Sequence, residues 1–229
     1  DRRMSTPSGT PATTIQDNTA TPFFAGIGSA TLPEQKFLPL TPALQRSWQE
    51  AERCLQDGDL VGARHLYQSL IDLPQLSGAC FRELARIAHR QGDLSRARIL
   101  LHAALRLESR DWAAYALFSD LLAEAQQREQ RLALWMTWGI ALAQAKEHAT
   151  AVERFAAIVQ EEPRQYAAWI NQGQERAALQ KDYPESHRCF WQAARLAARA
   201  YPEVATLLQD IEVHLEKVLD PPPALPAGP

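Results

Sequence analysis

The stretch that decides the fold is Leu132–Pro163, which reads LALWMTWGIALAQAKEHATAVERFAAIVQEEP. Two of its landmarks, Trp135 and Gly139, recur as Trp169 and Gly173, 34 residues further along the chain. A repeat of that length holds two helices of about 13 residues each and two tight turns. Because such a unit cannot bury its apolar stripe alone, the repeat predicts a stack of helical hairpins.

A second pair of landmarks repeats at the same distance in the first half of the chain. The tripeptide Gly-Asp-Leu at Gly58–Leu60 recurs at Gly92–Leu94. The apolar spacing before and after the first tripeptide predicts helices over 44–55 and 60–72, and Pro74 closes that hairpin. The body of the chain is therefore expected to be almost entirely helical.

These residues resemble the tetratricopeptide repeat (TPR) family, whose units carry a large residue at about position 4, a small one at 8, alanine at 20, an aromatic at 24, alanine at 27 and proline near 32. The unit that starts at Leu132 matches five of these sites. Its matching residues are Trp135, Gly139, Ala151, Phe155 and Pro163. Small residues at positions 8 and 20 let the two helices of a unit approach closely.

Three other units match in part. The residues that match are Ala63 and Tyr67 in the unit from Leu44, Phe81, Ala85, Ala97 and Ala104 in the unit from Gly78, and Trp169, Gly173, Ser186, Phe190 and Ala193 in the unit from Tyr166, the last three after a one-residue insertion. The resemblance covers residues 44–199. It implies an all-α fold, a right-handed superhelical stack of antiparallel helix hairpins of the TPR-like α-solenoid kind.

Twenty extra residues, 112–131, separate the first two units from the last two. A single unpaired helix accounts for them, with the polar stretch 124–131 ending it and turning the chain. Two pairings remain open beyond residue 112. The repeat signature pairs the helices within the units from Leu132 and Tyr166, whereas loop geometry pairs 112–126 with 131–145, 148–160 with 165–180, and 184–199 with 202–219.

The two ends of the chain differ from its body in composition. Residues 1–43 are rich in Thr and Pro and poor in large apolar groups, so this segment is predicted to be disordered. The helical domain is expected over 44–219, ending in a capping helix over 202–219 that has a polar outer side. Residues 220–229 are expected to form a stiff Pro-rich tail.

Charge and cysteine content limit the classes of function. The formal net charge of −3 and the pI near 6.1 favour neither a nucleic acid nor insertion into a membrane. The three cysteines lie far apart and form no Cys-x-x-Cys motif, which is typical of a reducing compartment. We therefore expect a cytoplasmic protein.

The sequence shows no motif for catalysis, a cofactor or a metal. It lacks a phosphate-binding glycine loop, Gly-x-Ser-x-Gly and His-Glu-x-x-His. His187 and Cys189 are two residues apart, so on a helix they point to different sides and do not form a nucleophile and base pair. We expect no catalytic residue, no cofactor and no metal site.

Three arginines, Arg82, Arg86 and Arg90, are spaced by four on one helix, with His89 beside them. The family resemblance places these four residues on the groove side of the first helix of a unit. Guanidinium groups at this spacing could hold a carboxylate or an acidic peptide. An equally weighted alternative is a solvated surface on which Glu83 and Asp93 pair with the arginines. The later groove candidates are less charged, and they are Met136, Ile140, Asn171 and Gln174.

The resemblance and the lack of catalytic motifs predict a non-enzymatic scaffold or adaptor. Its concave groove would bind an extended peptide or a partner's helix, and that partner protein could be acidic. The alternative is the helical interaction or regulatory module of a larger enzyme. An RNA-binding helical repeat is disfavoured by the net charge.

Overall fold

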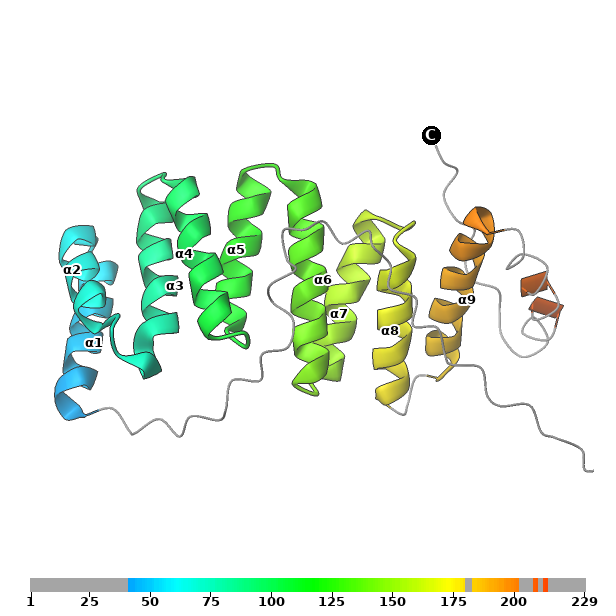
Figure 1. The fold of residues 1–229 in the computed structure, drawn as a ribbon, viewed down its shortest axis with the longest axis horizontal. Coiled ribbons are helices and arrows are strands. Elements are labelled where there is room, and N and C mark those ends of the chain that lie inside the picture. Colours follow the sequence, from blue (N-terminus) through cyan, green and yellow to red (C-terminus); the bar gives the residue numbers. More distant parts are fainter. Residues whose placement is uncertain (1–40, 180–182, 202–207, 210–211, 214–229) are drawn as a thin grey trace, which may run out of the picture. The chain divides into compact units, whose positions relative to one another are not determined.

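The computed structural model describes residues 41–179, 183–201, 208–209 and 212–213, all of which lie in one compact unit, Pro39–Pro229. Every regular element in this part of the chain is an α-helix, and the same residues hold no strand (Figure 1). The helices are α1 (Pro42–Gln56), α2 (Leu60–Leu70), α3 (Pro74–Arg90), α4 (Leu94–Leu107), α5 (Trp112–Glu124), α6 (Arg128–Gln144), α7 (His148–Glu161), α8 (Tyr166–Ala178) and α9 (Tyr183–Ala200). Each packs against the next along the chain. The predicted all-α stack of antiparallel hairpins is confirmed.

The first two hairpins turn on a glycine followed by an aspartate. Gly58 and Gly92 have φ values of +84° and +76°, in the left-handed region that glycine enters without steric cost. Asp59 and Asp93 then cap α2 and α4, because their side chains accept hydrogen bonds from the backbone N–H three residues on, at 2.9 and 3.0 Å. Each Gly-Asp pair thus ends one helix and begins the next.

The same turn occurs on both sides of α6, without glycine. Gln126 and Lys146 have φ values of +56° and +64°. In both turns the next residue donates its N–H to the carbonyl oxygen five residues earlier at 2.9 Å, as Asp93 does at 3.0 Å. Gly58, Gly92 and Gln126 are 34 residues apart, whereas Lys146 follows only 20 residues later. Hairpin turns therefore join α5 to α6 and α6 to α7.

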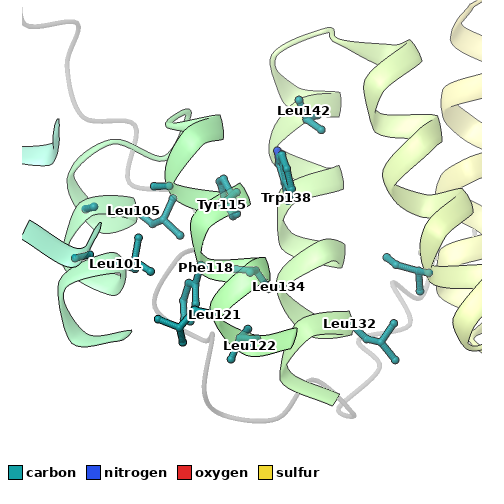
Figure 2. Close-up of a cluster of buried hydrophobic side chains, with 14 of the residues drawn as sticks. Leu101, Leu105, Tyr115, Phe118, Leu121, Leu122, Leu132, Leu134, Trp138 and Leu142 are labelled. Carbon is teal, nitrogen blue, oxygen red and sulfur yellow. The ribbon is translucent and has the colours of Figure 1, made fainter. Parts of the chain in front are cut away.

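Helix α6 belongs to two hairpins at once. Toward α5, the Trp135 indole donates to the Ser119 hydroxyl at 2.7 Å, and Trp138 stacks on Tyr115 with ring centroids 5.6 Å apart (Figure 2). Toward α7, Gly139 lies against an aromatic ring. Both pairings that the sequence left open are present among the described helices: α6 packs against α7 and α8 against α9, while α5 also packs against α6 and α7 against α8. The expectation of an unpaired helix at 112–131 is wrong, because α5 packs against α4 and α6 and residues 128–131 are already the first turn of α6.

The small residues at position 8 sit where two helices come closest. A Cβ atom added to Gly139 would lie 2.6 and 2.7 Å from ring carbons of Phe155, and one added to Gly173 would lie 3.0 Å from the ring of Phe190. Ala151, at position 20, is completely buried. These contacts confirm the steric reason for small residues at the two sites.

The buried side chains form two clusters. One lies between α1, α2 and α3, and the larger one runs from α3 to α8. Figure 2 shows part of the larger cluster, where leucines of α4, α5 and α6 surround the aromatic pair of Tyr115 and Trp138. A continuous core through consecutive helices is what an array of units that cannot fold singly requires.

Two helix limits differ from the prediction by a turn or less. Helix α1 begins at Pro42, two residues before the predicted start, because Thr41 caps its first turn by accepting from the N–H of Leu44. Helix α2 ends at Leu70 rather than at residue 72. Residues 1–40 of the predicted disordered segment and the whole predicted tail 220–229 lie outside the described residues.

The predicted capping helix over 202–219 also lies mostly outside the described residues. In the part that is described, Leu208 is buried. The Glu212 carboxylate accepts from the Trp191 indole at 2.6 Å and from Nε of Arg195 at 2.7 Å. This segment therefore packs against α9.

Candidate partner-binding surface

The Arg82 side chain is held by two buried carboxylates. Its Nη1 donates to Oδ2 of Asp111 at 2.6 Å, and its Nε donates to Oε1 of Glu83 at 3.0 Å. Burial lowers the pKa of the Arg82 guanidinium, and the charges and hydrogen bonds of Asp111 and Glu83 outweigh burial, so the pKa lies above its usual value. Asp111 also caps α5, because its Oδ1 accepts from the N–H of Ala114 at 3.0 Å. Arg82 thus ties α3 to the start of α5.

The other three candidates on α3 also have acceptors within the chain. Nη1 of Arg86 lies 3.1 Å from Oε2 of Glu83, so Glu83 pairs with two arginines. Nε2 of His89 lies 2.5 Å from Oε2 of Glu124 on α5. Nη1 of Arg90 donates to the carbonyl oxygen of Leu55 at 2.7 Å, near the end of α1. These side chains link α3 to α1 and to α5.

The four side chains on α3 differ in how much of their surface is accessible to a partner. The Arg82 side chain is 20% exposed, whereas that of Arg86 is 41% exposed. Of the two acidic partners expected from the sequence, Glu83 is present and Asp93 instead caps α4. Arg86 is therefore the more accessible of the two arginines that pair with Glu83, and Arg90 is exposed as well.

The second group of candidates lies on α6 and α8, which contact each other. The Asn171 amide is 3.4 Å from the sulfur of Met136, so these two side chains meet between the helices. Ile140 is exposed on α6, and Gln174 is exposed on α8. The structure thus brings an exposed apolar side chain, a thioether and two amides together on one pair of helices.

The two groups form separate surfaces. Helix α5 contacts both α3 and α6, so it stands between Arg86 on one side and Met136 on the other. The carboxylates of Asp120 and Glu124 on α5 are exposed. Sequence reasoning named Glu83 as a partner of the arginines but missed Asp111. Asp111 did carry a signal, since an aspartate before an apolar helical run is a typical N-cap.

The Cys80 thiol is poorly suited to nucleophilic chemistry. Burial, together with the charge of Glu83, raises the pKa of the Cys80 thiol to about 11 despite the opposing charge of Arg82, so the thiol stays protonated at neutral pH. Within the described residues, no group of three or more His, Cys, Asp or Glu side chains could hold a metal ion. No helix that the structure describes has both the length and the apolar character to cross a membrane.

The fold and this surface define a class of protein. The helix pairs, the close-approach residues and the 34-residue spacing of the turns make the chain a TPR-like helical repeat protein. No protein-family model matches the chain, and no curated protein matches it.

Solved structures match the fold at low sequence identity. A structure of MamA from Desulfovibrio magneticus RS-1 is 14% identical, with 71% of this chain and 99% of that chain covered and a TM-score of 0.39. YrrB, described as a TPR protein with an unusual peptide-binding site, is 15% identical over 72% of this chain and 90% of its own, with a TM-score of 0.35. PilF of Pseudomonas aeruginosa is 16% identical over 77% of this chain and 91% of its own, with a TM-score of 0.37. At these values the matches carry no inference about what this chain binds.

Proposed function

We propose that this chain is a non-enzymatic scaffold that binds a peptide or a helix of another protein on the surface of α6 and α8. The observation that carries the proposal is the exposed Ile140 beside the Met136–Asn171 contact. Covering a large apolar side chain with a partner removes it from water and so favours binding. Neighbouring amides can bind the partner's backbone by hydrogen bonds. Met136 can adapt its shape to different side chains of a partner.

The charge of the partner is a further part of the proposal. Arg86 is the more exposed of the two arginines that pair with Glu83, and it can bind a carboxylate of an acidic segment. The proposed partner is a protein rather than a nucleic acid, because the formal net charge of −3 gives no general attraction for a phosphate backbone. The wide spacing of the three cysteines supports a cytoplasmic location, where thiols stay reduced.

An affinity capture from cell lysate, read out by mass spectrometry, tests the proposal. The Ile140→Asp variant should lose the proteins that the unchanged chain captures, because a charge in the contact opposes burial. The matched control is Ile99→Asp, which places the same charge at an exposed isoleucine on α4, away from this surface. Both variants should keep the helical circular-dichroism signal.

Two outcomes would contradict the proposal. The first is capture of the same proteins by the Ile140→Asp variant. The second is equal loss in the Ile99→Asp control, which would place the contact elsewhere. Arg86→Glu tests the acidic segment separately, since it should weaken binding of an acidic partner and leave binding of a neutral one unchanged.

A further inference from the structure

Helices α2 and α4 differ from the other helices in their charge. Among the helices that the structure describes, these two alone contain no Asp or Glu. Together they carry four arginines, which are Arg64, Arg96, Arg98 and Arg106. A surface helix usually carries both signs of charge, because pairs of opposite sign stabilise it. The two helices are therefore a local concentration of positive charge in a chain whose formal net charge is −3.

The arginines of α4 have no carboxylate partner within the described part of the chain. The acidic residues nearest to α4 in sequence are Asp93, which caps the helix by accepting from a backbone N–H, and Glu108, which forms no ion pair with a described residue. On α3, by contrast, both Arg82 and Arg86 pair with Glu83. The guanidinium groups of α4 are thus available to an anion outside the chain.

The same two helices carry the two most exposed large apolar side chains that the structure describes. Val61 of α2 is 70% exposed, and Ile99 of α4 is 69% exposed. Ile99 is three residues after Arg96 and seven before Arg106, so these three side chains share one side of α4. An aliphatic side chain this accessible is stabilised when an apolar environment covers it.

Helices α2 and α4 turn these side chains to the same side of the stack. They are the second helices of consecutive units, and Ala63 and Ala97, which are 34 residues apart, are both completely buried. The same spacing makes His65 the equivalent of Ile99, and equivalent positions of stacked units face one side. We call this surface the basic face, and its residues are Val61, His65, Arg96, Ile99 and Arg106, with Arg64 and Arg98 at its edge.

We infer that the basic face is a docking site for the surface of a membrane that contains anionic phospholipids. Arg96 and Arg106 bind the phosphate and carboxylate groups of the lipids by charge-assisted hydrogen bonds. Val61 and Ile99 enter the boundary between headgroups and acyl chains, where exposed aliphatic side chains lose their contact with water. Charge complementarity selects this occupant, because arginines without acidic neighbours repel a cationic surface and attract an anionic one.

Other anionic partners fit the basic face less well. Nucleic-acid surfaces combine arginines with aromatic side chains on which the bases stack, whereas the apolar members of this face are aliphatic. The core of a protein interface is also enriched in aromatic residues and Met. A membrane surface requires no matching pocket, so side chains that stand free in solvent can insert into it.

Cosedimentation of the full chain with lipid vesicles tests the inference. The chain should bind vesicles of phosphatidylcholine with about 30% phosphatidylserine, and it should not bind vesicles of phosphatidylcholine alone. Binding should weaken as salt is raised. The double variant Arg96→Gln, Arg106→Gln should lower the partition coefficient by about 30-fold. Ile99→Ser should lower it by about tenfold, and Ile99→Leu should retain it.

A matched control separates the basic face from net charge. The double variant Arg164→Gln, Arg199→Gln removes the same charge at two exposed arginines outside α2 and α4, and it should leave vesicle binding unchanged. Because Arg96, Ile99 and Arg106 are exposed, their variants should keep the circular-dichroism signal.

Three results would overturn the inference. They are no binding to the anionic vesicles at low salt, full binding by the Arg96→Gln, Arg106→Gln variant, and equal loss in the control. Polyglutamate and single-stranded RNA serve as the other anionic probes. If either binds through Arg96 and Arg106 while the vesicles do not, the face takes a different class of partner and the inference is wrong. The vesicles contain no protein, so this test can fail while the proposed scaffold function holds.

Discussion

Gly139 and Gly173 form a matched pair for a test of close helix packing, because each lies against a phenylalanine ring of the next helix. Gly139→Ala adds a Cβ at 2.6 and 2.7 Å from the Phe155 ring, and that ring is 1% exposed and cannot move aside. Gly173→Ala adds one at 3.0 Å from the Phe190 ring, which is 37% exposed and free to shift toward solvent. The two substitutions are chemically identical and occupy the same repeat position.

The expected magnitudes follow from two opposing effects. Alanine gains about 1 kcal/mol over glycine inside a helix. Overpacking a buried contact costs about 2 to 3 kcal/mol, and the cost is highest where the neighbouring side chain is enclosed on all sides. Gly139→Ala should therefore lower the free energy of unfolding by about 1 to 2 kcal/mol. Gly173→Ala should change it by between a loss of about 1 kcal/mol and a gain of about 1 kcal/mol, because the Phe190 ring can yield whereas Cβ of the buried Cys189, 3.2 Å from the added atom, yields less.

Urea denaturation followed by circular dichroism measures both variants. A double-mutant cycle adds the control, since Phe155→Leu removes the ring atoms that Gly139→Ala strikes. The two changes should couple, with the double variant more stable than the sum of the single effects by about 1 kcal/mol or more. Equal effects of the two glycine variants, or no coupling, would refute the claim that the Gly139 contact is sterically closed.

Two further predictions concern charge. Arg82→Gln should lower the free energy of unfolding by about 3 kcal/mol, because it leaves the buried carboxylate of Asp111 without its cation and Glu83 with Arg86 alone. Arg86→Gln, at a more exposed pair, should cost about 1 kcal/mol or less, and equal losses in urea denaturation would contradict the difference in burial. Burial raises the pKa of Tyr115 to about 12, so the folded state holds this proton more tightly than the unfolded chain does. Stability should therefore be complete below about pH 10 and fall as the pH rises toward 12, by about 1 kcal/mol at pH 11 for this group. Between pH 8 and pH 11 the free energy of unfolding of the Tyr115→Phe variant should fall by about 1 kcal/mol less than that of the unchanged chain. If urea denaturation at the two pH values gives the same fall for both proteins, the phenol is not buried.

The fold was largely predictable because its signals are local. The Gly-Asp turns at Gly58 and Gly92 and the small residues at Gly139 and Gly173 each have a steric cause that shows in the sequence. The double role of α6 was not predictable. The turns on either side of it place Gln126 and Lys146 in the left-handed region. Neither Gln nor Lys favours that conformation, so the sequence does not indicate these turns.

The candidate site was less predictable because its decisive contacts are distant along the chain. Arg82 meets Asp111 29 residues away, and Arg90 meets the carbonyl of Leu55 35 residues away. Spacing by four correctly places the arginines on one helix, but it does not tell which guanidinium groups have internal acceptors. Met136 and Asn171, which the sequence names only as separate groove candidates, meet between α6 and α8.

The central claim is that α6 packs against α5 and α7 as the shared helix of two hairpins. A nuclear Overhauser spectrum of the full chain, with selectively labelled aromatic residues and glycine, tests it most directly. We expect cross-peaks from the Trp138 indole to the Tyr115 ring and, in the same spectrum, from the Gly139 α-protons to the Phe155 ring. Cross-peaks to one of these rings without the other would show that α6 has a single hairpin partner and would contradict the account.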